Sequence, residues 1–227
     1  MYNFIKKYFW PILITLFFGL GFLSAATARA DFQRDTEMSV QYNPKTETLY
    51  LSGQTTMAQV FGAALWLTGD SKASTVVMEG PGGLLDAGLI LGRMIDKSGA
   101  TVRIDEGTRC VSACAFAAMG SDYVDIDGDL WLHTFYAPYI PSTLNLMEVG
   151  KFHQEGTHKV MEYMMKQGYS NTLAQYLFSK TDYCNFLVVS DSEALKGLKY
   201  DTTNFTQFFE NRYSFLRDNT TTTSTCK

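Results

Sequence analysis

The stretch that decides the fold runs from Val76 to His133. It reads VVMEGPGGLLDAGLILGRMI over residues 76–95, TVRIDEGTRCVSACAFAAMG over residues 101–120 and DYVDIDGDLWLH over residues 122–133. A Gly-Pro-Gly-Gly turn follows its first apolar run, a serine stands between two cysteines, and a histidine closes the last apolar run. Each feature alone fits an ordinary core. Together they suggest a serine nucleophile, a general base and a backbone oxyanion hole.

Strand and helix patterns alternate along this stretch. Residues 75–78 and 101–104 are short runs rich in β-branched residues, which predict buried strands. Between them, apolar positions from Leu84 to Ile95 recur at helical spacing. Residues 123–126 and 130–132 predict two further strands. The alternation is typical of an α/β domain with a largely parallel sheet.

The flanking segments predict further regular elements. Alternating apolar residues from Met38 to Leu51 indicate a β-hairpin or two short strands, and residues 56–67 have helical spacing. A small-residue helix is expected to begin at Ser112. Residues 137–150 are expected to form a loop. Three helices should follow it, beginning near Lys151, at Ser170 and at the capping-box sequence Ser190-Asp191-Ser192-Glu193.

The first thirty residues have the layout of a secretory signal peptide. Lys6 and Lys7 precede an apolar run from Tyr8 to Ala25, and Ala28-Arg29-Ala30 supplies small residues for cleavage before Asp31. We therefore expect export, to the periplasm in a bacterium. The alternative is an uncleaved N-terminal anchor, because the apolar run approaches the length that spans a bilayer.

Composition narrows the class of protein. Removing residues 1–30 removes three of the 19 basic residues and no acidic one, which leaves 16 against 23 and a net charge of −7. This acidic balance argues against a nucleic-acid partner. The remaining length suits one domain, expected over residues 31–218, with a threonine-rich flexible tail over residues 219–227.

Four cysteines, an even number, permit two disulfides in an exported chain. Cys110, Cys114, Cys184 and Cys226 allow three connectivities, between which the sequence alone does not choose. A zinc site is the competing interpretation. It is disfavoured because no second close Cys/His pair accompanies Cys110 and Cys114, and no metal is expected.

These motifs, in combination, resemble the proteolytic subunit of the Clp protease, within the ClpP/crotonase superfamily. The similarity covers about Leu49 to Asp201 and implies a spiral of β-β-α units with a largely parallel sheet. The Cys-x-Ser-Ala-Cys sequence is more similar to exported, periplasmic ClpP-like proteins. The resemblance is carried by two motifs, two single residues and two C-terminal groups: Leu51-Ser52-Gly53-Gln54, Glu79-Gly80-Pro81-Gly82-Gly83, Ser112, His133, Asn185-Phe186-Leu187, and Ser192-Glu193-Ala194 with Gly197-Leu198. The two C-terminal groups resemble the family's closing helix segment.

The resemblance implies a catalytic set. Ser112 stands where the family has its nucleophile, and His133 where it has its general base; His153 and His158 lie in a polar helical stretch and are most simply solvated. A serine hydroxyl needs such a base within hydrogen-bond reach. The position of the family's aspartate holds a cysteine here, so nearby Asp182 is the candidate third member of the set, or the site works as a Ser-His dyad.

The same comparison implies an oxyanion hole and a disulfide beside it. The backbone N–H groups of Gly83 and Ala113 are the candidate donors to the developing oxyanion. Cys184 would pair with Cys114 or, nearly as plausibly, with Cys110, tying the nucleophile turn to the final segment of the domain.

We therefore expect an exported ClpP-like serine hydrolase, a peptidase that acts through an acyl-enzyme on peptide or protein substrates. No metal, nucleotide or coenzyme is implied. An ATP-driven unfoldase partner is not expected outside the cytoplasm, while a homo-oligomer is compatible. The alternative is a catalytically inactive ClpP-like module that binds a peptide or protein. A crotonase-type acyl-CoA enzyme is a weaker third option.

Overall fold

A computed structural model describes residues 38–70, 72–134, 145–181, 185–200 and 214–217. The chain divides into two units, Met1–Glu37 and Met38–Lys227, and all described residues belong to the second. The expected signal peptide, the candidate residue Asp182, the cysteines at positions 184 and 226 and the expected tail lie outside the described residues.

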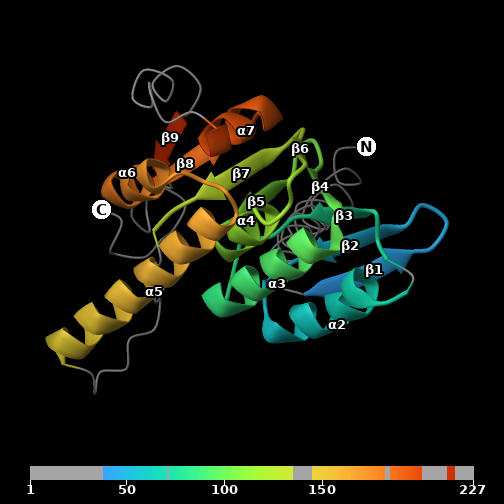
Figure 1. Ribbon diagram of the computed structural model, residues 1–227, viewed down its shortest axis with the longest axis horizontal. Helices are drawn as coiled ribbons and strands as arrows, with labels where there is room; N and C mark the ends of the chain where they lie inside the picture. The colour runs from blue at the N-terminus through green and yellow to red at the C-terminus, as the bar shows by residue number, and fades with distance from the viewer. Residues whose placement is uncertain (1–37, 71, 135–144, 182–184, 201–213, 218–227) are drawn as a thin grey trace, which may run out of the picture. The chain divides into compact units, whose positions relative to one another are not determined.

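The first sheet has five strands and is mainly parallel (Figure 1). Only β1 is antiparallel to its neighbour. The predicted strands between residues 38 and 126 are thus confirmed, and the fold class is α/β. In spatial order the strands are β1 (Ser39–Asn43), β2 (Thr48–Ser52), β3 (Thr75–Met78), β4 (Thr101–Ile104) and β6 (Val124–Ile126).

A second sheet, of four strands, accompanies the largely parallel one. Its strands, in spatial order, are β5 (Arg109–Val111), β7 (Asp129–Leu132), β8 (Asn185–Val189) and β9 (Ser214–Arg217). β5 and β7 are parallel, whereas β8 is antiparallel to both its neighbours. The sequence Asn185-Phe186-Leu187, which resembles the start of a closing helix segment, forms a strand because four consecutive apolar residues bury there.

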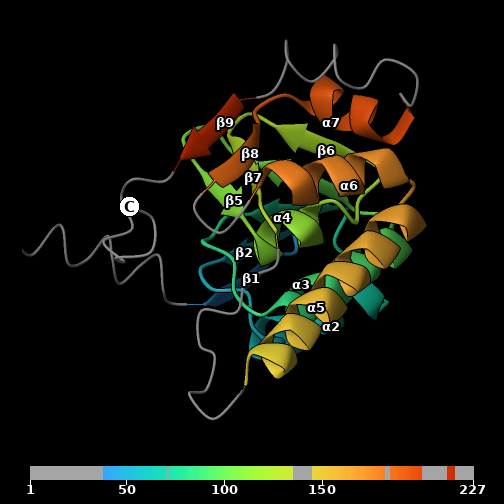
Figure 2. The same ribbon diagram turned by 90° about the vertical axis from the view of Figure 1, so that its left-hand side faces the viewer.

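Helices cover the apolar side of the first sheet (Figure 2). Leu49, Leu51 and Val76 point to this side and are buried together with Val60 of the first helix and Leu91 of the second. The opposite side of the sheet includes Tyr50, Val77 and Arg103, which lie next to one another on β2, β3 and β4. The helices are α2 (Met57–Thr68), α3 (Leu85–Ser98), α4 (Ala113–Ala118), α5 (Leu146–Lys166), α6 (Asn171–Lys180) and α7 (Ser192–Tyr200).

Two helix boundaries differ from the sequence prediction. α5 begins at Leu146 rather than near Lys151, because Asn145 and Glu148 form a reciprocal capping box. The predicted capping box at Ser190 is wrong in its first residue. The Asp191 carboxylate instead accepts the Glu193 N–H at 2.8 Å, and α7 starts one residue after Asp191. Among the described residues, none of the helices has both the length and the apolar character needed to cross a bilayer.

Candidate functional site

Ser112 occupies a sharp turn between strand β5 and helix α4. Its backbone has φ 57° and ψ −120°, a conformation that side-chain-bearing residues seldom adopt. The Ser112 N–H donates to the carbonyl of Trp131 at 2.9 Å, and its own carbonyl accepts from the Phe116 N–H at 3.0 Å. Such a conformation costs about 1–3 kcal/mol and persists only where surrounding contacts impose it, which happens most often at functional sites.

The glycine-rich turn after β3 is held by hydrogen bonds at both of its ends. At the first end, the Gly80 N–H donates to the carbonyl of Arg109 at 2.9 Å, and the Val111 N–H donates to the carbonyl of Gly80 at 3.0 Å. These bonds form a parallel bridge between Gly80 and Cys110. The bridge connects the end of the first sheet to the strand that precedes Ser112.

At its second end the turn is bonded to Thr55. The Thr55 N–H donates to the carbonyl of Gly82 at 2.7 Å, and the Leu84 N–H donates to the carbonyl of Thr55 at 2.9 Å. Thr55 is thus bonded to the residues before and after Gly83, and in such a parallel bridge the middle residue directs its own N–H away from the partner strand. The N–H of Gly83 therefore points away from Thr55.

Gly82 lies directly against the Ser112 turn. A Cβ at Gly82 would stand 2.7 Å from the Cβ of Ser112, 2.7 Å from the carbonyl oxygen of Val111 and 3.2 Å from the nitrogen of Ala113. Its φ is 94°, which also favours glycine. Only glycine fits, and the Gly82-Gly83 segment thereby lies next to the backbone N–H of Ala113.

His133 lies at the same sheet edge as Ser112. Strands β5 and β7 are parallel neighbours, and Val111, the last residue of β5, lies opposite Trp131. Ser112 directly follows β5, and His133 directly follows Leu132, the last residue of β7. The His133 ring is half-buried and packs on the Phe186 ring of β8, with 4.9 Å between ring centroids. The register of the second sheet therefore brings together two residues that are distant in the chain.

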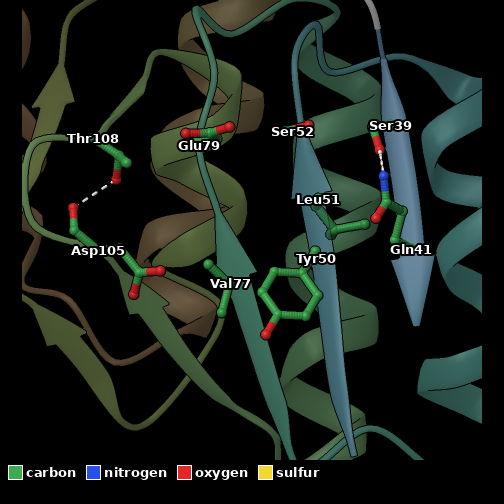
Figure 3. Close-up of a pocket in the computed structure, with 9 residues that line it drawn as sticks. All are labelled: Ser39, Gln41, Tyr50, Leu51, Ser52, Val77, Glu79, Asp105 and Thr108. Atoms are coloured by element: carbon green, nitrogen blue, oxygen red, sulfur yellow. Dashed lines mark hydrogen bonds between the residues drawn. The ribbon is translucent and has the colours of Figure 1, made fainter. Parts of the chain in front are cut away.

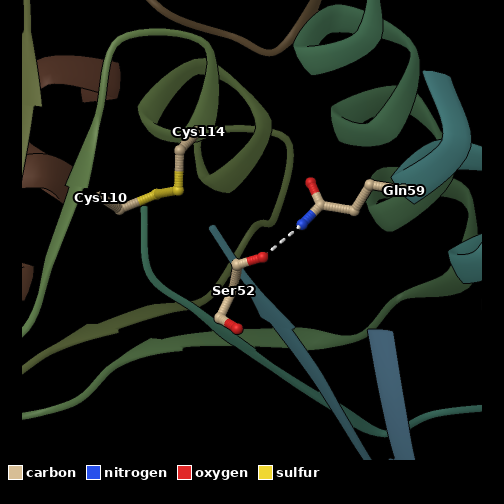
Figure 4. The surroundings of a disulfide bond; sticks show 4 residues. All are labelled: Ser52, Gln59, Cys110 and Cys114. Atoms are coloured by element: carbon tan, nitrogen blue, oxygen red, sulfur yellow. Dashed lines mark hydrogen bonds between the residues drawn. A yellow bond between two sulfur atoms is a disulfide. The ribbon is translucent and has the colours of Figure 1, made fainter. Parts of the chain in front are cut away.

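The cysteines beside Ser112 pair with each other. Cys110, the middle residue of β5, and Cys114, in the first turn of α4, form a disulfide with 5.3 Å between their Cα atoms (Figure 4). The expectation that one of them pairs with Cys184 is therefore wrong. The physical reason is local: the sharp turn at Ser112 folds the first turn of α4 back over β5, so that both side chains enter the same core region.

Helix α4, which follows the Ser112 turn, is held in place by a hydrogen bond from Tyr163 of α5. The Tyr163 hydroxyl donates to the carbonyl of Phe116 at 2.8 Å in the buried interior. Burial raises the pKa of Tyr163 well above its usual range, so the hydroxyl stays protonated and remains a donor. Gly92 of α3 makes room for it, because a Cβ there would stand 2.0 Å from the Tyr163 oxygen.

A pocket of about 250 Å³ lies on the polar side of the first sheet (Figure 3). Its lining includes Tyr50, Glu79 and Asp105, and Ser112 and His133 are not part of it. One of its lining residues, Glu79, immediately precedes the glycine-rich turn. We assign it no role in the chemistry.

Of the predicted site residues, Ser112, Ala113 and Gly83 lie on adjacent pieces of backbone, and His133 follows the strand next to the one that ends before Ser112. His153 and His158 lie on α5, and His158 is exposed. Sequence reasoning did not single out Gly82, whose contact with Ser112 requires glycine most directly. The signal was present in the second glycine of Gly-Pro-Gly-Gly, but spacing alone does not tell which glycine touches another segment.

No protein-family model matches this chain, and no curated protein matches it. Within the described ranges, no three His, Cys, Asp or Glu side chains are grouped so that they could hold a metal ion. What the described site offers is a strained serine, a histidine at the same edge and glycine-rich backbone beside them.

Proposed function

We propose that this protein is an exported ClpP-like serine hydrolase that cleaves peptide bonds through an acyl-enzyme. The observation that carries the proposal is the Ser112 turn, strained at φ 57° and packed against Gly82 at the sheet edge where His133 follows β7. A serine on a sharp strand-to-helix turn is a recurrent arrangement of hydrolase nucleophiles. The order of glycine turn, serine and histidine along the chain adds the resemblance to the ClpP/crotonase superfamily.

In this proposal Ser112 Oγ attacks the carbonyl carbon of the scissile peptide bond while His133 accepts the hydroxyl proton. The carbonyl oxygen becomes an oxyanion, which accepts hydrogen bonds from the N–H groups of Gly83 and Ala113. His133 then donates its proton to the leaving amine, and the acyl group stays on Ser112. Water, deprotonated by His133, then attacks the acyl carbon, the bond to Ser112 Oγ breaks, and His133 returns the proton to Oγ, which restores the free serine.

Two features of the site support this assignment of donors. The bridge to Thr55 directs the Gly83 N–H away from Thr55, and Gly83 is exposed to solvent. The Ala113 nitrogen is 3.2 Å from where a Gly82 Cβ would stand, so the two donors belong to adjacent pieces of backbone. Losing one oxyanion donor costs about 3–4 kcal/mol of transition-state stabilisation in other hydrolases.

Fluorophosphonate labelling of the purified, folded protein tests the proposal, because this probe reacts with activated serines. We expect labelling of the wild type and its loss in Ser112→Ala and in His133→Ala. Ser179→Ala and His158→Ala, two changes at exposed helix positions, are the matched controls and should leave it intact. Digestion of peptides by the wild type and not by Ser112→Ala would then identify a peptidase.

No labelling of folded wild-type protein would reject the hydrolase. That outcome would support the second candidate, a ClpP-like module that keeps the fold to bind a peptide or protein partner. The cystine that brackets Ser112 is the observation that favours it, since the two cysteines crowd the residues next to the serine.

A further inference from the structure

We propose that the Cys110–Cys114 disulfide is a positioning element of the site, which holds Ser112 in its strained conformation. The inference rests on the proposed function and deepens it. Ser112 is the central residue of the five-residue loop that this disulfide closes. The cross-link therefore joins the middle of β5 to the first turn of α4 across Ser112 itself.

The turn needs such a constraint because helix α4 is short. It has six residues, Ala113–Ala118, and so short a helix does not persist by its own hydrogen bonds. If its first turn unwound, the backbone of Ser112 could relax from φ 57° to a common conformation. The link from Cys114 to Cys110 prevents this unwinding, because Cys110 is itself fixed in β5.

Cys110 is fixed by neighbours on both sides. It pairs with Leu130 in the parallel register of β5 and β7, and it forms the isolated bridge with Gly80. A cross-link to such a residue transmits the rigidity of the sheet to α4. The disulfide thus holds α4 to the sheet on either side of Ser112 and does not join two distant segments of the chain.

Burial makes this link permanent rather than switchable. The exposed fractions of Cys110 and Cys114 are 0% and 2%. Reduction requires a thiolate to reach one of the sulfur atoms, and in the folded protein the core surrounds both. We therefore expect dithiothreitol to leave the native protein oxidised and its serine reactivity unchanged.

The test compares wild type with Cys110→Ala/Cys114→Ala by two independent measurements. The first is the fluorophosphonate labelling rate per folded molecule, expected to fall on the order of 10²-fold, since a shift of about 1 Å at a reacting group has that effect. The second is amide hydrogen exchange of residues 111–118, expected to become faster while exchange in β3 stays unchanged. The second measurement does not require activity.

A destabilised control separates positioning from general stability. Val60→Ala removes buried methyl groups from α2, outside the loop that the disulfide closes. It should lower stability but leave labelling per folded molecule and exchange of residues 111–118 at wild-type values. If the double variant does not fold, Cys114→Ala alone, which retains the Cys110 side chain, takes its place in both measurements.

The outcomes distinguish this inference from the proposed function. Wild-type exchange and labelling in the double variant would overturn the positioning role of the disulfide. Faster exchange of residues 111–118 in a protein whose wild type is never labelled would support the constraint on the turn and reject the hydrolase. Equal loss of labelling in Val60→Ala would show that stability, not positioning, controls the serine, and would also overturn the inference.

Discussion

Replacing Gly82 by alanine is the sharpest test of the proposed geometry. The new Cβ would stand 2.7 Å from the Cβ of Ser112 and from the carbonyl oxygen of Val111, whereas ordinary van der Waals contact begins at 3.4 Å. Relief of this overlap requires a shift of about 0.7 Å. The backbone itself has to move, because one neighbour is a backbone oxygen and the other is a Cβ bonded directly to the backbone. The shift falls on the Ser112 turn.

The expected effect is a loss of serine reactivity larger than the loss of stability. A displacement approaching 1 Å reduces reaction on the order of 10²-fold, equivalent to about 2.7 kcal/mol of activation free energy. The positive φ of Gly82 adds a cost of about 1–2 kcal/mol to folding. Reactivity is measured as the rate of fluorophosphonate labelling, and stability as the free energy of unfolding in urea.

Gly99→Ala is the matched control. Gly99 also has a positive φ, 71°, but a Cβ there has no atom within 4 Å. This variant should have the same conformational cost in stability and the labelling rate of the wild type. If Gly82→Ala were labelled as fast as wild type, still through Ser112, the contact between the two turns would not control the serine, and our account of the site would be refuted.

Two further predictions concern the support of the site. Tyr163→Phe removes the hydrogen bond to the Phe116 carbonyl and should lower the free energy of unfolding by about 1–3 kcal/mol, measured in urea near pH 7. Burial raises the pKa of Tyr163, so above about pH 10 the hydroxyl loses its proton in the unfolded chain but keeps it in the folded protein. The unfolding free energy of the wild type should therefore fall with pH more steeply than that of Tyr163→Phe, by up to about 1.4 kcal/mol per pH unit. If the unfolding free energies of the two proteins ran parallel with pH, the burial effect would be contradicted. Cys110→Ala/Cys114→Ala should lower unfolding stability by about 2 kcal/mol, the loop entropy of a five-residue ring, and an unchanged melting temperature would contradict it.

Elements with a strong local pattern could be predicted from the sequence. Helix α3 is an example, because its apolar stripe and the left-handed Gly99 that ends it are properties of neighbouring residues. The same holds for β1 and β2, whose alternation is visible over five residues each. The Cys-x-Ser-Ala-Cys motif and the Gly-Pro-Gly-Gly turn can also be recognised in the sequence, because each is a contiguous run of residues.

Strand β5 could not be predicted in this way. Its three residues, Arg109–Val111, are too few to show a period. They are extended because Gly80 on one side and β7 on the other supply hydrogen-bond partners. Without β5 the second sheet is not recognisable in the sequence.

The pairing of the cysteines depended on the same strand. An even count permits several connectivities, and only the geometry of the Ser112 turn brings Cys110 and Cys114 close enough to bond. A bond to Cys184 would instead connect distant segments of the chain. A strand and a helical turn that meet at a sharp angle made the local connection possible.

By itself the sequence therefore determined the α/β class, most of the helices and strands, and the residue types available for chemistry. These follow from periodicity, capping and turn residues, all of which act over a few neighbouring positions. The tertiary structure alone decided that Gly82 touches Ser112 and that His133 leaves the sheet beside it. Such contacts depend on strand register between distant segments, which is set by the packing of the whole core rather than by any local pattern.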